Sequence, residues 1–82
     1  MVEKGMVISL SMESDEIKNY LIAKRVEDFS NGEGGWLCID TDAISEKGVD
    51  NISAMDCWRV SDKYLEVQMK RGVIQIAKLI EN

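Results

Sequence analysis

A chain of 82 residues, 45% hydrophobic and 30% charged, has the composition of one folded globular domain, residues 1–82, and not of a disordered segment. Fifteen acidic residues against ten basic ones leave a net charge of −5. This balance argues against a nucleic-acid-binding protein, which needs surplus Lys and Arg to neutralise phosphates. No long apolar run is present, which excludes a membrane-spanning helix and argues against a secretory signal, so we expect a cytoplasmic protein.

The chain has no histidine and two cysteines, Cys38 and Cys57. A structural zinc site needs about four ligands, so we predict no metal and no other cofactor. Both cysteines are interpreted as reduced, mostly buried small hydrophobic residues. Without histidine, acid–base catalysis and cysteine activation lack their usual residue, so the sequence favours a protein that is not an enzyme.

The first predicted element is a strand over residues 6–12, preceded by Gly5. Met6, Ile8, Leu10 and Met12 occupy every second position of this segment. A period of two is typical of a strand with one buried face, and we expect these four side chains to face the core.

Residues 15–29 fit two templates. A helix would begin after Ser14 as its cap and would place Ile17 and Leu21 on one side. A strand would fold back across the glycine-rich residues 31–35 onto the strand that follows. The turn residues favour the strand, and helix remains the alternative.

In the favoured arrangement Val26 lies opposite Ile39, and Arg25 lies opposite Asp40, which are sensible cross-strand pairs.

Four apolar residues open the next predicted strand, residues 36–42. Residues 43–56 are predicted to be a loop, with one helical turn over residues 50–55 as an option. Residues 57–60 follow as a short strand, and residues 61–63 as a tight turn.

The strongest pattern predicts a C-terminal hairpin over residues 64–80. Leu65, Val67 and Met69 alternate with polar residues, and Ile74 and Ile76 continue the alternation after the turn at Arg71-Gly72. The pairing that keeps the apolar side chains together sets Met69 opposite Ile74 and Val67 opposite Ile76. Glycine in the turn provides the positive φ that a short hairpin connection needs.

These elements predict an all-β fold: a small antiparallel barrel or a curled sheet. The pattern of a glycine-led first strand, a wide excursion and then a meander resembles an SH3-like barrel. The alternative is an α+β domain in which one helix, residues 15–29, packs on an antiparallel sheet. A last strand with a free edge is compatible with a homodimer.

The candidate binding residues are aromatic or charged. Trp58-Arg59 is the pair most typical of an interface, because Trp and Arg dominate binding hot spots. Trp36 and Tyr64, and also Tyr20, could line a groove near strand ends, although core packing is the competing interpretation for each tryptophan.

Asp40 and Asp42 complete the candidate set. They end an apolar strand, where paired carboxylates resemble the Asp-x-Asp of aspartate-nucleophile phosphatases. The chain is too short for that fold, and a solvated turn is the simpler interpretation.

The sequence therefore predicts a non-enzymatic protein-interaction module that acts as a regulator, inhibitor or accessory subunit, with another protein as its partner. One alternative is an acidic nucleic-acid mimic, of the kind encoded by phages and other mobile elements, that inhibits a nucleic-acid-binding enzyme. The other is a small-ligand or nucleotide-binding β domain. The carboxylates expected on the mimic's negative face are Glu13, Asp15, Glu16, Glu27, Asp28, Glu33, Asp40 and Asp42.

Overall fold

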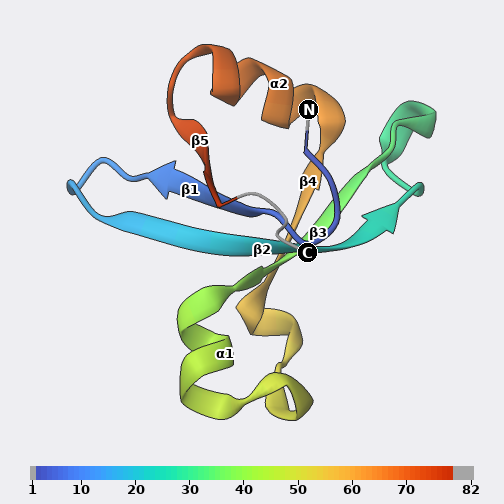
Figure 1. The fold of residues 1–82 in the computed structure, drawn as a ribbon. Helices are drawn as coiled ribbons and strands as arrows, with labels where there is room; N and C mark the ends of the chain where they lie inside the picture. Colours follow the sequence, from blue (N-terminus) through green and yellow to red (C-terminus); the bar gives the residue numbers. More distant parts are fainter. Residues whose placement is uncertain (1, 79–82) are drawn as a thin grey trace.

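The computed structural model describes residues 2–78, which form one five-stranded antiparallel sheet and two helices (Figure 1). The strand order is β4-β3-β2-β1-β5, so β2 is central and β4 and β5 are the two edges. The strands are β1 Val7–Ser11, β2 Ile17–Val26, β3 Gly35–Asp40, β4 Cys57–Ser61 and β5 Ile74–Lys78.

Two helices flank this sheet. α1, Thr41–Lys47, follows β3, and α2, Asp62–Lys70, follows β4; the two lie on opposite sides of the sheet (Figure 1). The connections contain three short 3-10 turns: η1 Ser30–Gly32, η2 Val49–Asn51 and η3 Ala54–Asp56. The curled antiparallel sheet is confirmed, but the sheet does not close, so the SH3-like barrel is not formed. The all-β class was wrong, because two helices accompany the sheet. The alternative α+β class had a helix with an antiparallel sheet but placed that helix at residues 15–29, which form β2 and the ends of its loops.

The first two strands agree with the sequence pattern. Met6 and Ile8 are buried in the core and Leu10 is half-buried, as predicted. The prediction for Met12 was wrong: β1 ends at Ser11, and Met12 is 42% exposed in the β1–β2 turn. Residues 17–26 form a strand, as favoured. This strand can be long because it pairs on both sides, with β1 and with β3.

The predicted register between β2 and β3 was wrong. Val26 lies opposite Gly35, and Arg25 lies opposite Trp36. β3 begins at Gly35, after a shorter connection than predicted, so Arg25 pairs with Trp36, four residues before the predicted partner Asp40. The bulge between Ile22 and Lys24 adds one residue to β2 and shifts the pairing by one residue only.

The segment expected to be a loop at residues 43–56 contains α1 and two 3-10 turns. β3 ends at Asp40, whose side chain accepts a hydrogen bond from the Asp42 backbone N–H (2.9 Å) and so caps α1. Gly48, at φ 83°, ends the helix. The predicted strand to residue 42 was thus two residues too long.

The predicted C-terminal hairpin was wrong in its first arm, because residues 62–70 form α2. The Ser61 hydroxyl accepts a hydrogen bond from the Tyr64 N–H (3.1 Å) and caps this helix. Leu65 and Met69 are four residues apart, so they lie on one helix face and both pack on the core. Val67, two residues from each, is 43% exposed.

Gly72 has the positive φ that the sequence predicted, 76°, but it ends α2 and does not form a hairpin turn. The Val73 N–H donates to the Gln68 carbonyl (3.0 Å), which is the bond of a Schellman helix end. β5 then pairs with β1, where Ile74 lies opposite Leu10 and Ile76 opposite Ile8. The predicted strand over residues 79–80 lies outside the described residues.

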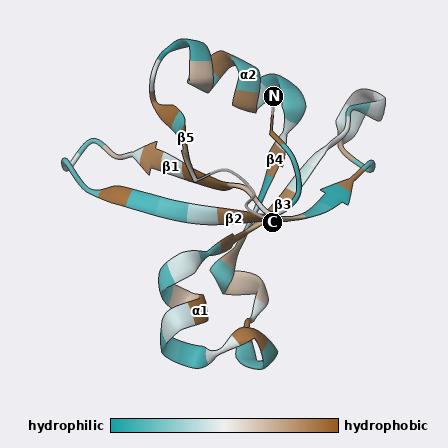
Figure 2. Cartoon of the chain, viewed as in Figure 1, coloured by the Kyte–Doolittle hydropathy of each residue, from teal (hydrophilic) through white to brown (hydrophobic). Residues whose placement is uncertain are grey.

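One face of the sheet forms the core. Ile22 lies opposite Cys38, and Cys38 lies opposite Trp58, so the three share this face. α2, through Leu65, and Val2 near the start of the chain cover it. Figure 2 shows apolar residues in the strands and in α2. No helix within residues 2–78 combines the length and apolarity needed to cross a membrane. The buried members of the core are Val2, Met6, Ile8, Ile22, Cys38, Val60, Leu65 and Ile74.

We predict that Ile22→Ala lowers the free energy of unfolding by about 2–5 kcal/mol, because it leaves a cavity at a fully buried position. Ile17→Ala, on the same strand but 66% exposed, changes it by less than about 0.5 kcal/mol. Urea unfolding followed by tryptophan fluorescence measures both. Equal losses for the two variants would contradict the assignment of the core face.

Candidate functional site

Three of the predicted binding residues lie together at the β4 edge of the sheet. Trp58 and Arg59 belong to β4, and Tyr64 lies in the first turn of α2. The Trp58 ring lies between two tyrosines: the ring centroids are 5.0 Å from Tyr20 and 6.1 Å from Tyr64, the latter nearly perpendicular. Trp58 is half-buried and Tyr64 is 44% exposed, so the cluster belongs partly to the core and partly to the surface.

The backbone of β4 has a free outer edge. The Asp62 N–H donates to the Gly34 carbonyl (3.0 Å), which identifies residues 34 and 62 as a hydrogen-bonded pair. Bonded and non-bonded pairs alternate along an antiparallel ladder, so Trp58 and Val60 direct their backbone groups toward β3. The backbone groups of the intervening residues, Cys57, Arg59 and Ser61, therefore point outward from the sheet.

Two of these outward groups are used within the chain. The Cys57 N–H donates to the Ala54 carbonyl. The Ser61 carbonyl is at the N-cap of α2, where it accepts the first helical bond. The Cys57 carbonyl, both groups of Arg59 and the Ser61 N–H are left along the edge.

A groove of about 310 Å³ lies over this edge. Trp58 and Tyr64 form its wall on the core face of the sheet. Phe29 and Arg59 form its wall on the opposite face, where the Arg59 guanidinium lies 5.2 Å from the Phe29 ring centroid. We call this feature the β4 edge groove; its lining residues are Phe29, Ser30, Glu33, Trp58, Arg59, Val60, Ser61 and Tyr64.

The second wall depends on a glycine. A Cβ on Gly35 would overlap the Phe29 ring and the Val60 carbonyl oxygen, so only glycine lets Phe29 pack against the strand at this point. Arg59 is held over Phe29 by an ion pair with Asp28. The groove is therefore shaped by packing that is already present in the free protein.

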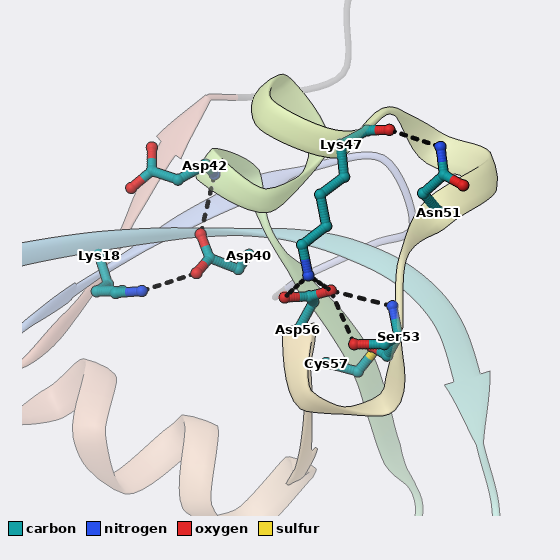
Figure 3. A network of polar contacts seen from close by, with 8 residues as sticks. All are labelled: Lys18, Asp40, Asp42, Lys47, Asn51, Ser53, Asp56 and Cys57. Atoms are coloured by element: carbon teal, nitrogen blue, oxygen red, sulfur yellow. Dashed lines mark hydrogen bonds and ion pairs between the residues drawn. The ribbon is translucent and has the colours of Figure 1, made fainter.

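A second hollow, also about 310 Å³, adjoins the start of β4. Tyr20 and Trp58 line it, and Met55 of η3, 95% exposed, stands at its rim. Lys18 and Asp40 line it as well and form an ion pair of 2.7 Å (Figure 3). The Lys18 ammonium lowers the pKa of Asp40, and the hydrogen bond from Lys18 to Asp40 raises the pKa of Lys18 in turn.

The η3 turn beside this hollow is held by Asp56. Its carboxylate accepts hydrogen bonds from the Ser53 N–H (3.0 Å) and the Lys47 ammonium (2.9 Å) (Figure 3). These two donors, the Ser53 N–H first, lower the pKa of Asp56 to about 2. The network fixes the chain that enters β4 and so fixes one end of the groove.

Asp42 and Trp36 lie away from this site. The Asp42 carboxylate points away from the Lys18–Asp40 pair (Figure 3), and Asp42 contributes its N–H to the cap of α1. Trp36 lines a separate cleft of about 750 Å³ between β3, α2 and the N-terminal segment. Val2, Leu65 and Met69 form its apolar walls.

Charged side chains rim the Trp36 cleft. The Arg25 guanidinium lies 5.0 Å from the Trp36 ring centroid and forms two 2.7 Å hydrogen bonds with the Asp62 carboxylate. The hydrogen bonds to Asp62 and Glu27 raise the pKa of Arg25. Lys70 and Glu66 of α2 pair with each other at 3.3 Å on the same rim.

Sequence reasoning missed Phe29, Leu65 and Met69 as cavity-lining residues. Phe29 reaches the groove only because the β2–β3 loop folds back over Gly35, and no local pattern indicates that. Leu65 and Met69 were assigned to a strand face, where they could not line a cleft opposite Trp36. The four-residue spacing of Leu65 and Met69, after the capping residue Ser61, was the available signal.

The carboxylates proposed for an acidic face are spread over three places. Three lie on the β1–β2 turn and three on the β2–β3 loop, at opposite ends of β2 (Figure 1), and two lie at the start of α1. Three of the eight are ion-paired. The pairs are Glu27 with Arg25, Asp28 with Arg59, and Asp40 with Lys18.

The Cys38 thiol does not lie in a reactive setting. Burial raises the pKa of the Cys38 thiol to about 12, so this thiol stays protonated at neutral pH. Cys38 and Cys57 point to opposite faces of the sheet, because Cys38 lies opposite Trp58 and Cys57 lies opposite Ile39. Within residues 2–78, no cluster of three or more carboxylate or thiol side chains is arranged to hold a metal ion.

Comparison with protein-family models, with curated proteins and with solved structures finds no match for this chain.

We predict that the Asp56 carboxyl titrates near 2 and not at its ordinary value of 3.8. Because folding lowers this pKa, the stabilisation is present above 3.8 and is lost as the pH falls toward 2. Lys47→Met raises the midpoint only part of the way, since the Ser53 N–H remains, whereas Lys63→Met on α2 leaves it unchanged. Carboxyl-carbon NMR titration measures the midpoints; a wild-type value of 3.8 would refute the network.

Proposed function

We propose that this chain is a non-enzymatic protein-interaction module that binds a partner protein at the β4 edge groove, as a regulator, inhibitor or accessory subunit. One observation carries the proposal: Trp58, Arg59 and Tyr64 gather where the sheet has a free edge and a preformed groove. These are the residue types that dominate binding hot spots.

The balance of burial supports this proposal. Trp58 is anchored by Tyr20 and by the core, so it is held in one orientation, while Tyr64 stays 44% exposed. A rigid aromatic wall with an exposed polar tip binds at low cost in conformational entropy. The ion pair of Asp28 with Arg59 likewise orients the guanidinium before any partner arrives.

We predict that Tyr64→Ala weakens binding by about tenfold or more, the effect of losing a hot-spot side chain. Val67→Ala is the matched control, because Val67 is equally exposed (43%) on the same helix but does not line the groove. The probes are peptides selected from a phage-displayed random library against the intact chain, with affinities measured by calorimetry. Equal affinities for the two variants, or a library that yields no binding peptide, would overturn the proposal.

A small apolar ligand in the Trp36 cleft is the second candidate function. The volume of the Trp36 cleft, about 750 Å³, falls within the range of ligand sites, about 300–1,000 Å³. The lining is mostly apolar, with Arg25 and Asp62 at the rim to orient a polar group. The two tryptophans thus line different cavities, Trp36 this cleft and Trp58 the β4 edge groove.

For this candidate we predict that the fitting ligand changes the tryptophan emission, and that Trp36→Phe abolishes the change while Trp58→Phe keeps it. The probes are a panel of medium-chain fatty acids added to the whole chain. No change in emission with any of them, or a response that follows Trp58, would exclude the cleft as a ligand site.

A further inference from the structure

We propose that the β4 edge groove accepts an extended, positively charged segment of another protein, which adds to the sheet as a sixth strand beside β4. This inference rests on the proposed function and names the conformation and the chemistry of the partner.

The backbone of β4 provides the first argument. The Cys57 carbonyl, the N–H and carbonyl of Arg59 and the Ser61 N–H point outward at every second residue. An extended chain presents its own N–H and carbonyl groups to one side with the same two-residue repeat, so the two sets match. A helix cannot match them, because its backbone groups are bonded internally.

The side-chain walls provide the second argument. In an added strand, residues that bond to β4 carry their side chains on the Phe29 and Arg59 face. The intervening residues carry theirs on the opposite face, against Trp58 and Tyr64. Alternate side chains of the partner therefore meet different walls, and the face with Trp58 favours bulky apolar residues.

The walls also distinguish β4 from the other edge. The same alternation leaves Ile74 and Ile76 of β5 with outward backbone groups. β5 contains no aromatic residue, and within residues 74–77 the exposed side chains are Gln75 and Ala77. Backbone hydrogen bonds would be available there, but specificity would not.

The net charge of the chain favours a segment of another protein, and not a second copy of this chain, as the occupant of the β4 edge groove. Each copy carries −5, so two copies repel, whereas a basic segment is attracted. Arg59 is already paired with Asp28, and Glu33 lines the groove half-buried. A residue directly opposite Arg59 should not be basic, because like charges in cross-strand pairs are destabilising.

The test uses a synthetic peptide in which threonine alternates with phenylalanine or valine, with lysines at both ends. Two forms carry N-methyl groups, one on every threonine and the other on every apolar residue. Strand addition requires the threonine amides to bond to β4 and leaves the apolar amides facing away. The first form should therefore lose binding by about tenfold or more, and the second should bind as the unmodified peptide does.

Two variants of the chain test the same bonds from the other side. Arg59→Pro removes an outward N–H that β3 does not use, so the sheet should tolerate it, as edge strands tolerate proline. Arg59→Ala removes the side chain alone and is its matched control. We expect peptide affinity about tenfold lower for Arg59→Pro than for Arg59→Ala. Amide exchange at Arg59 and Ser61 should slow on binding of the peptide to the unmodified chain.

The outcomes separate the two proposals. In one outcome, library peptides bind in a Tyr64-dependent way while the two N-methylated peptides bind equally and Arg59→Pro binds as Arg59→Ala does. In that case strand addition is wrong and the interaction module stands. If no peptide binds at all, the proposed function fails with it. Slow exchange at Arg59 without peptide, together with a dimer by light scattering, would show that a second copy fills the edge and would overturn the choice of partner. Should Arg59→Pro not fold, the N-methylated peptides alone decide.

Discussion

The burial of one sheet face is the constraint on which the rest of this structure depends. Ile22 and Cys38 lie opposite each other on the central strands and are fully buried, so something must cover them. In this chain of 82 residues, α2 covers them through Leu65, and Val2 covers them from the other end of the chain. Because α2 covers this face, the described residues 2–78 provide no further strand to close the sheet, and β4 and β5 form its two edges.

Hydrogen-bonded and non-bonded pairs alternate along antiparallel strands, and this alternation decides which backbone N–H and carbonyl groups point outward from each edge strand. Because the residues of β4 that bond to β3 are those whose side chains enter the core, the outward backbone groups belong to Cys57, Arg59 and Ser61. The same geometry places Trp58 on the core face and Arg59 on the other, so one strand supplies both walls of the groove. The core and the β4 edge groove thus follow from a single register.

Local ion pairs shape the surface more than the net charge does. Asp40 and Asp62 each accept hydrogen bonds from a cation, which lower the pKa of their carboxyls. The Ser53 N–H, and then the Lys47 ammonium, lower the pKa of Asp56. These hydrogen bonds hold the starts of α1, β4 and α2, the points where the chain leaves or enters β3 and β4. Much of the acidic excess thereby orients the segments around the groove and does not form one negative face.

Sequence alone determined the first strand, the short strand at β4 and the burial of Ile74, because each has a pattern with one template that fits best. Residues 17–26 fitted both a helix and a strand, and only the turn residues that follow them favoured the strand. It also indicated Trp58, Arg59 and Tyr64, although not that the fold brings them together. Leu65, Val67 and Met69 satisfy a period of two, but Leu65 and Met69 also satisfy a helical spacing. Only the tertiary structure decided between them: Ser61 caps a helix, Leu65 and Met69 cover the open face of the sheet, and β1 offers β5 a partner edge. The local pattern of residues 62–70 cannot decide between strand and helix, because the groups that make the helix favourable lie on strands distant in the chain.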